Sequence, residues 1–206
     1  SSNPIGGQMV AIKTYGTRVD NMIIKDPVSV KFALGENPKT TFSEKNQSPV
    51  TRMAVAALIR EQLSKAKKYL QDKDKFLNAP EENDEPEFDA KNEALIPLLR
   101  REVPAHFHAH RSDDIFTAIR ISKEFNLDYV IIHCTEGHII ADELKKENTK
   151  VFSGPFLADR SKPELVNLTP KTPGILAEKG VKASIVTDHP VTPIQYLPVC
   201  ASLAVK

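Results

Sequence analysis

Short apolar runs alternate along the chain with segments in which apolar residues recur every three or four positions. The apolar runs predict strands and the longer spacing predicts helices. The expected strands are residues 10–12, 29–34, 103–110, 129–132, 150–152 and 181–186. The expected helices are residues 55–70 (after a Ser48-Pro49 start), 115–125, 139–146, 173–179 and 196–205.

The order of these elements predicts the fold class. Strands that alternate with helices form a parallel sheet with helices outside it, and residues 129–132 have the continuous apolar character of a strand buried on both faces. An open doubly wound α/β sheet and a (β/α) barrel both fit. We expect one domain over residues 1–206. Residues 79–89 hold six acidic residues and two prolines, which predicts an exposed acidic connector at about 72–89.

Composition excludes several functional classes. The formal net charge is +1, without the basic excess of a broad nucleic-acid surface. Two cysteines cannot form a disulfide scaffold. No apolar run approaches the roughly 20 residues that span a bilayer. The first residues, SSNPIGG, lack the basic and apolar regions of a signal peptide. We therefore expect a soluble cytoplasmic protein with no nucleic-acid or membrane partner.

Histidine and aspartate side chains collect where the expected strands end. His106, His108 and His110 alternate along one strand and should point to the same face. His133 follows residues 129–132, and Asp188 follows 181–186. Active sites of parallel α/β folds form at this edge. Imidazole nitrogen and carboxylate oxygen are ligands that Zn²⁺ accepts. The spacing favours a metal or catalytic role over hydrogen-bonded structural histidines.

Six short segments carry a resemblance to a known family. They resemble the amidohydrolase superfamily, most closely its imidazolonepropionase-like members. The segments are SSNPIGGQ, FALGENPK, FHAHRSDD, VIIHCTEGH, VFSGPFL and ASIVTDHP. The resemblance covers nearly the whole chain except residues 72–89. It implies a partial metal-dependent TIM (β/α)₈ barrel that begins near the family's third strand and ends after the eighth.

The resemblance also implies a set of site residues. The metal ligand of the family's fifth strand corresponds to His108, with His110 as the alternative, and that of the sixth strand to His133. Some members use a further glutamate, for which Glu36 is the matching position. The aspartate of the eighth strand corresponds to Asp188.

The implied activity is hydrolysis of a C–N bond in a small molecule (a cyclic amide, an amide or an amidine) by a metal-activated water. The metal would be divalent, Zn²⁺ in first place, with Fe²⁺ or Mn²⁺ as alternatives. Asp188 would take the proton of the water and pass it to the leaving nitrogen. His110 or His138 would bind the substrate and polarise its oxygen.

The chain departs from the family pattern in one respect. The His-x-His metal pair of the family's first strand has no counterpart, which predicts weak metal binding and the central part of a longer enzyme. An alternative is a catalytically inactive barrel-derived domain that binds or scaffolds. An incomplete barrel has unpaired sheet edges, so a homo-oligomer is a further expectation.

Overall fold

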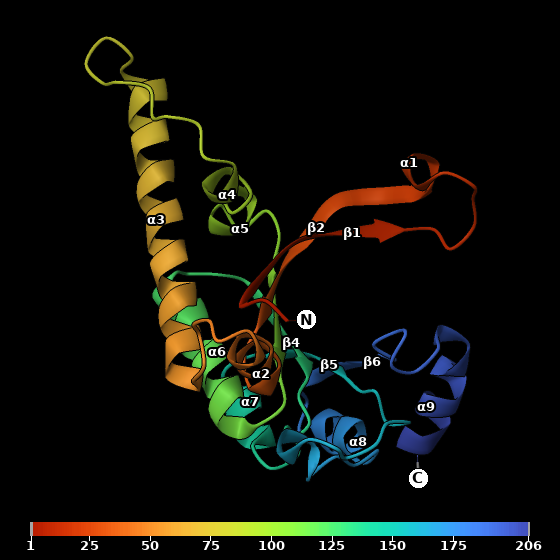
Figure 1. The fold of residues 1–206 in the computed structure, drawn as a ribbon. Coiled ribbons are helices and arrows are strands. Elements are labelled where there is room, and N and C mark those ends of the chain that lie inside the picture. Colours follow the sequence, from red (N-terminus) through yellow and green to blue (C-terminus); the bar gives the residue numbers. More distant parts are fainter. Residues whose placement is uncertain (1, 206) are drawn as a thin grey trace.

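A six-stranded sheet organises the protein, and its strands lie side by side in sequence order. The computed structural model describes residues 2–205. The strands are β1 (Ile5–Ile12), β2 (Ile23–Ala33), β3 (Ala105–Ala109), β4 (Tyr129–His133), β5 (Lys150–Ser153) and β6 (Lys182–Ile185). β1 and β2 are antiparallel and every later pair is parallel (Figure 1).

Helices connect the strands. They are α1 (Val19–Met22), α2 (Glu36–Glu44), α3 (Arg52–Asn78), α4 (Ala90–Glu93), α5 (Ile96–Leu99), α6 (Ser112–Glu124), α7 (Ala141–Lys146), α8 (Thr172–Glu178) and α9 (Leu197–Ala204). Two 3₁₀ turns, Pro163–Leu165 and Ile194–Tyr196, interrupt the later loops. α6 shows why such segments pack on the sheet, because its buried residues recur at helical spacing. These residues are Asp114, Ile115, Ala118, Ile119, Ile121 and Ser122.

The hydrophobic core lies between one face of the sheet and the helices. Phe32 on β2 and Phe107 on β3 are in register, and their rings stack with centroids 4.8 Å apart. Ile131 on β4 belongs to the same cluster, as do Val55 and Ile59 of α3. Because side chains alternate along a strand, this arrangement turns the neighbours of these residues to the opposite face. That opposite face carries the polar residues discussed below.

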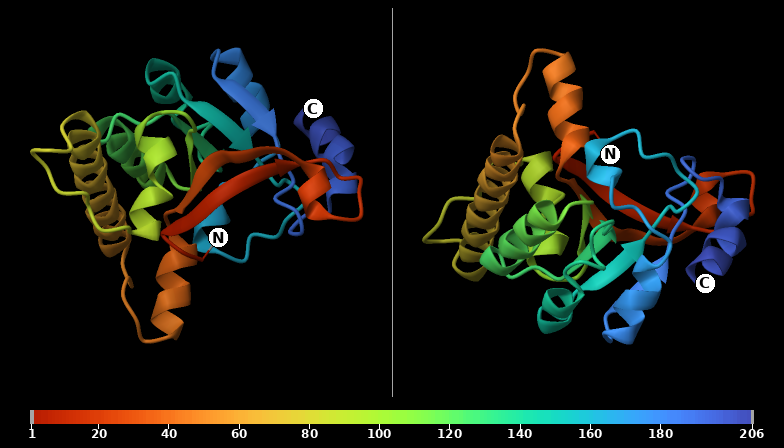
Figure 2. Two further views of the ribbon diagram at one scale, coloured as in Figure 1. Left: turned by 90° about the horizontal axis from the view of Figure 1, so that it is seen from above. Right: turned by 90° about the horizontal axis from the view of Figure 1, so that it is seen from below.

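The expected parallel α/β architecture is confirmed for β2 to β6, whereas closure into a barrel is not. Within residues 2–205, β1 pairs only with β2 and β6 only with β5, so the sheet is open at both edges. The two views in Figure 2 show it curving, with the helices on its outer side. The structure is therefore a curved, mostly parallel sheet, which is consistent with part of an α/β barrel.

No helix was expected at residues 36–44, because glycine and proline usually end a regular element and Gly35 and Pro38 lie here. Pro38 is the third residue of α2. The first four N–H groups of a helix have no partner inside it, so a proline there costs no hydrogen bond. Gly35 precedes the helix with φ of +77°, a conformation that favours glycine. This short helix matters because Glu36 and Asn37 sit in its first turn.

The acidic connector begins later than the sequence indicated. α3 continues to Asn78, so residues 72–78 are helical and the irregular loop covers 79–89. Buried residues of α3 end at Ala66, and the second half of the helix projects from the sheet with the acidic loop at its tip (Figure 1). Across residues 2–205, no helix has both the length and the apolar character needed to cross a membrane.

Candidate metal centre

Three buried histidines meet at the carboxyl ends of β3 and β4. His108 lies in β3, His110 directly follows it, and His133 is the last residue of β4. The ring centroid of His133 is 4.5 Å from that of His108 and 4.5 Å from that of His110. Each residue offers one nitrogen such that the three atoms lie within 4.8 Å of one another. This is a ligand set of the size and type that holds Zn²⁺.

The backbone of His133 brings its side chain to this cluster. His108 is in register with Ile132, so strict alternation would send His133 with Ile131 to the helix-covered face. His133 instead has φ of +73° and Cys134 has φ of +50°. A positive φ re-aims the Cβ of a residue, and such values in non-glycine residues collect at functional sites. The sequence pattern found His133 as a site residue, but it did not reveal this turn.

The proton of His133 is placed by a backbone acceptor. Nδ1 lies 2.7 Å from the carbonyl oxygen of Gly154, so it carries the proton and donates it. Nε2 is then a lone-pair nitrogen, and it is buried without a hydrogen-bond partner in the part of the chain that the structure describes. A metal ligand whose other nitrogen donates to a carbonyl has this arrangement. An orphaned lone pair beside two other imidazoles fits a metal ion.

The proton of His108 is placed by an amide. Lys162 donates to Asn37 Oδ1, so the NH₂ group of Asn37 must face the other way. The NH₂ group faces His108, and the distance from Asn37 Nδ2 to His108 Nε2 is 3.2 Å. Nε2 of His108 therefore accepts, and its lone pair points at Asn37. Sequence reasoning did not find Asn37 or Lys162, because neither stands in a recognised motif and Lys162 lies in an irregular loop.

Burial keeps these imidazoles neutral. It lowers the pKa of His110 to about 2 and that of His108 well below its ordinary value. Burial also lowers the pKa of His133 to about 4, although the negative charge of Asp188 opposes the shift. Metal ligation requires neutral imidazole, so no proton has to leave the cluster at neutral pH. The three rings are thus in the protonation state that a divalent metal ion needs, and Nε2 of His108 would exchange Asn37 for the ion.

Asp188 and Lys31 add opposite charges beside the histidines. Asp188 Oδ2 lies 3.8 Å from His133 Nε2, and its side chain is 44% exposed. Lys31 of β2 is in register with His106 and shares its face of the sheet, and burial lowers the pKa of its ammonium while Asp188 opposes that shift. Sequence reasoning missed Lys31. A cavity of about 250 Å³ is lined by the three clustered histidines, Asp188, Asn37 and Lys162.

The structure does not bring every expected residue to this cavity. His138 Nδ1 lies 3.0 Å from Thr172 Oγ1, and His138 is not among the described residues that line the cavity. Glu36 does not line it either. Its Oε1 lies 3.8 Å from an Arg52 nitrogen, in a neighbouring charged network. The roles of His138 as a substrate-binding residue and Glu36 as a metal ligand stay predictions.

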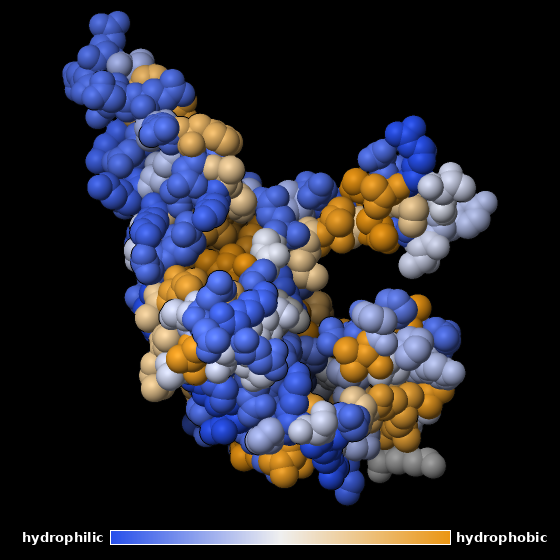
Figure 3. All heavy atoms as spheres, in the orientation of Figure 1, coloured by the Kyte–Doolittle hydropathy of each residue, from blue (hydrophilic) through white to orange (hydrophobic). Residues whose placement is uncertain are grey.

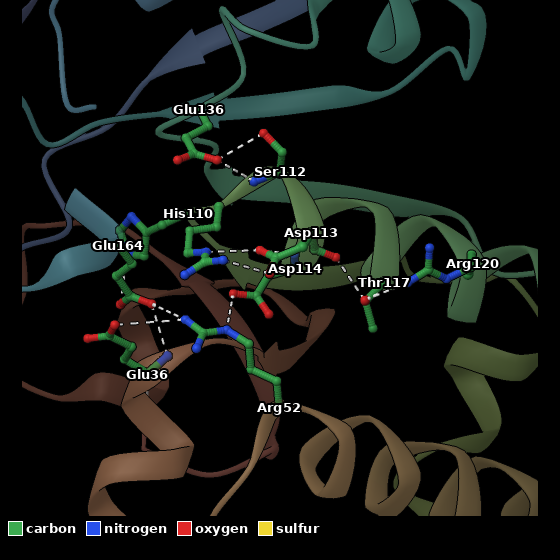
Figure 4. A network of polar contacts seen from close by, with 11 residues as sticks. Glu36, Arg52, His110, Ser112, Asp113, Asp114, Thr117, Arg120, Glu136 and Glu164 are labelled. Atoms are coloured by element: carbon green, nitrogen blue, oxygen red, sulfur yellow. Dashed lines mark hydrogen bonds and ion pairs between the residues drawn. The ribbon is translucent and has the colours of Figure 1, made fainter. Parts of the chain in front are cut away.

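That charged network lies next to His110, which it meets through Glu164 (Figure 4). Arg52 Nε donates to Asp114 Oδ2 over 3.1 Å. A terminal nitrogen of Arg52 lies 4.0 Å from Glu164 Oε2, and Glu164 Oε1 lies 3.8 Å from His110 Nε2. Burial raises the pKa of both Asp114 and Glu164, and Arg52 opposes this at Asp114. Arg52 also forms an ion pair with Glu36, so one arginine is the shared cation of three carboxylates.

We expect the metal-free protein to lose stability as the pH falls below about 6.5. His108, His110 and His133 take up protons in the unfolded chain near that pH but stay neutral in the folded chain. The unfolded state then binds more protons than the folded state, so the free energy of unfolding decreases as the pH falls. Three such groups contribute on the order of 4 kcal/mol between pH 7 and pH 5.5. The raised pKa values of Asp114 and Glu164 offset part of this at lower pH.

Urea unfolding at pH 7 and pH 5.5, with the protein free of metal, measures this difference. A variant with all three of these histidines replaced by glutamine is the control, and its stability should change much less over the same range. A free energy of unfolding that is constant or higher at pH 5.5 in the original chain would contradict the neutral state of the cluster.

Comparison with solved structures finds a protein of similar fold and sequence. It is a crystal structure of an amidohydrolase from Thermotoga maritima MSB8, with a TM-score of 0.93 and 42% sequence identity. The match covers 100% of this chain and 53% of that protein, so this chain spans about half of its relative's length. Comparison with family models gives no match, and comparison with curated proteins gives none either.

Proposed function

We propose that this chain is the metal-binding portion of an amidohydrolase, a metal-dependent hydrolase that acts on C–N bonds in small molecules. The observation that carries the proposal is the cluster of His108, His110 and His133, which is buried and has its ligand atoms within 4.8 Å of one another. The 42% identity to an amidohydrolase supports it. The residues that gave the imidazolonepropionase-like resemblance support that subtype as the finer proposal.

A divalent ion at these histidines, Zn²⁺ in first place, would act as a Lewis acid and activate water. The residues of the chain have distinct tasks around it. His133 offers Nε2, because Gly154 holds the proton on the other nitrogen. Asp188 lies 3.8 Å from that Nε2 and is half-exposed, so it is placed to accept a proton from water and deliver it to a leaving nitrogen. Lys162 and Asn37 line the cavity next to His108.

The small cavity and the mixed charge of its lining favour a polar small-molecule substrate. We also propose a cytoplasmic location, which the two free cysteines Cys134 and Cys200 support, since both are buried and unpaired. The free edges of β1 and β6 support self-association as a further proposal.

Turnover of C–N substrates tests the proposal. A panel of cyclic amides, linear amides and amidines is incubated with the Zn²⁺-loaded chain, with chelator-treated chain, and with an Asp188→Asn variant. We expect hydrolysis that chelation removes and Zn²⁺ restores. Asp188→Asn should lower kcat about 100-fold or more, because the amide cannot take the proton. Near-normal turnover of Asp188→Asn would contradict the proton-transfer role.

The same assay separates the second candidate, an inactive binding or scaffold domain. The open sheet edges favour this candidate for the chain alone. Metal binding without hydrolysis of any substrate class in the panel would support it over the hydrolase.

A further inference from the structure

Glu164 has a wholly buried carboxylate and no role in the reaction proposed above. It sits in the 3₁₀ turn Pro163–Leu165, and its side chain is 0% exposed. Its Oε2 accepts a hydrogen bond of 2.9 Å from the Glu36 N–H. Its Oε1 has no hydrogen-bond partner within residues 2–205 and faces His110 Nε2 at 3.8 Å. A buried acceptor is normally paired, and His110 Nε2, although beyond hydrogen-bond length, is a ring nitrogen that this oxygen faces.

The surroundings hold this carboxylate in one position. A Cβ added to Gly35 would lie 2.6 Å from Glu164 Oε2, so the carboxylate packs where only glycine leaves room. Gly35 also has φ of +77°, which suits glycine. An Arg52 nitrogen lies 4.0 Å from the same oxygen and attracts the ionised carboxylate, whereas burial and the nearby Glu36 and Asp114 raise the pKa of Glu164. Glycine, a backbone N–H and a cation thus fix Glu164 from three sides.

The other nitrogen of His110 cannot decide where the proton lies. Nδ1 is 2.7 Å from Thr135 Oγ1. A threonine hydroxyl donates or accepts equally well, so it adapts to either tautomer of the ring. The ionised carboxylate of Glu164 only accepts. The choice of tautomer at His110 therefore falls to Glu164.

We propose that Glu164 is a positioning residue that holds the proton of His110 on Nε2 and fixes the orientation of its ring. The lone pair of His110 then lies on Nδ1, where it accepts from the Thr135 hydroxyl. The three histidines become unequal. His133 has a free lone pair, whereas a metal ion reaches that of His108 only by displacing Asn37 and that of His110 only by displacing Thr135. This last consequence rests on the proposed function; the position of the proton does not.

The tautomer is measured directly by long-range ¹H–¹⁵N correlation on metal-free chain labelled at histidine. We expect His110 in the original chain to carry its proton on Nε2. Glu164→Gln should raise the fraction protonated on Nδ1 several-fold, because the amide of glutamine can also donate to the ring. Glu164→Asp, which keeps the acceptor, should largely retain the original tautomer. Resonances of His133, whose proton is held by Gly154, should stay unchanged.

Glu136→Gln is the matched control. Glu136 also accepts from neighbouring groups, the N–H and the hydroxyl of Ser112 and the amide of Asn167, but it does not line the cavity in the described chain. The tautomer of His110 should not respond to its replacement. A proton on Nδ1 of His110 in the original chain would overturn the proposal even if no variant folds, and so would an unchanged tautomer in folded Glu164→Gln. Neither result depends on metal or on hydrolysis, so the proposed function is judged separately.

Discussion

Replacing His133 by alanine should strongly weaken the binding of a divalent metal ion. Its ring lies 4.5 Å from each of the other two rings, centroid to centroid, so it is the shared neighbour of both. Its Nε2 is the nitrogen whose lone pair is free and buried. Removal of a residue that only supports a ligand costs about 10–100-fold in metal affinity. Loss of a ligand itself should cost about 100-fold or more, measured by competition for Zn²⁺ with a chromophoric chelator.

His138→Ala is the control for this experiment. His138 follows the same strand but bonds to Thr172 and lies outside the cavity lining of the described residues. Its removal should leave Zn²⁺ affinity within about twofold, which is below 0.5 kcal/mol. If His133→Ala retains Zn²⁺ as well as His138→Ala does, then the metal is not held by the histidine cluster and the proposed function loses its main support.

Replacing Arg52 by alanine should destabilise the folded chain by about 3 kcal/mol. Arg52 is the cation that Asp114, Glu164 and Glu36 share, at distances of 3.1, 4.0 and 3.8 Å. Asp114 and Glu164 are almost completely buried, so without Arg52 their charges would be left uncompensated. Removing one partner of a buried pair is costly for this reason. The free energy of unfolding in urea at pH 7 measures the loss.

Arg60→Ala provides a control on the same helix. Arg60 pairs with Glu124 at 2.6 Å, but both side chains are substantially exposed. Exposed ion pairs contribute about 0–1 kcal/mol, so this variant should be nearly as stable as the original. Equal losses for the two variants would mean that Arg52 acts through packing of α3 and not through the buried carboxylates.

The sequence predicted the strands that carry the histidines, but it did not predict the backbone turn that brings His133 to the other two rings. Residues 129–132 and 103–110 were recognisable because their apolar and alternating patterns follow from burial on a sheet. Alternation also placed His108 and His110 on one face. It could not place His133, since the positive φ that turns the ring inward leaves no mark in the pattern of residue types. The prediction of His133 depended on its position after a strand and on family resemblance.

The site residues that the sequence did not identify lie mainly outside the predicted strands and helices. Asn37 lies in a helix whose glycine and proline had indicated a break, and Lys162 and Glu164 lie in an irregular stretch between β5 and α8. No periodic pattern links positions 37 and 162, although the two side chains bond to each other. Such contacts come from tertiary packing of segments more than 100 residues apart, which local propensity does not encode.

Gly154 connects the histidine cluster to strand β6. Its carbonyl oxygen accepts the His133 proton, and it lies where β5 meets β6, since a Cβ there would be 2.2 Å from the carbonyl oxygen of Val186. Detaching β6 would therefore disturb the acceptor that keeps the His133 lone pair free. Thermodynamic linkage makes this coupling reciprocal, so a ligand captured at Nε2 also strengthens the attachment of the C-terminal strand. We therefore expect pairing of β6 with β5 and occupancy of the histidine cluster to stabilise each other.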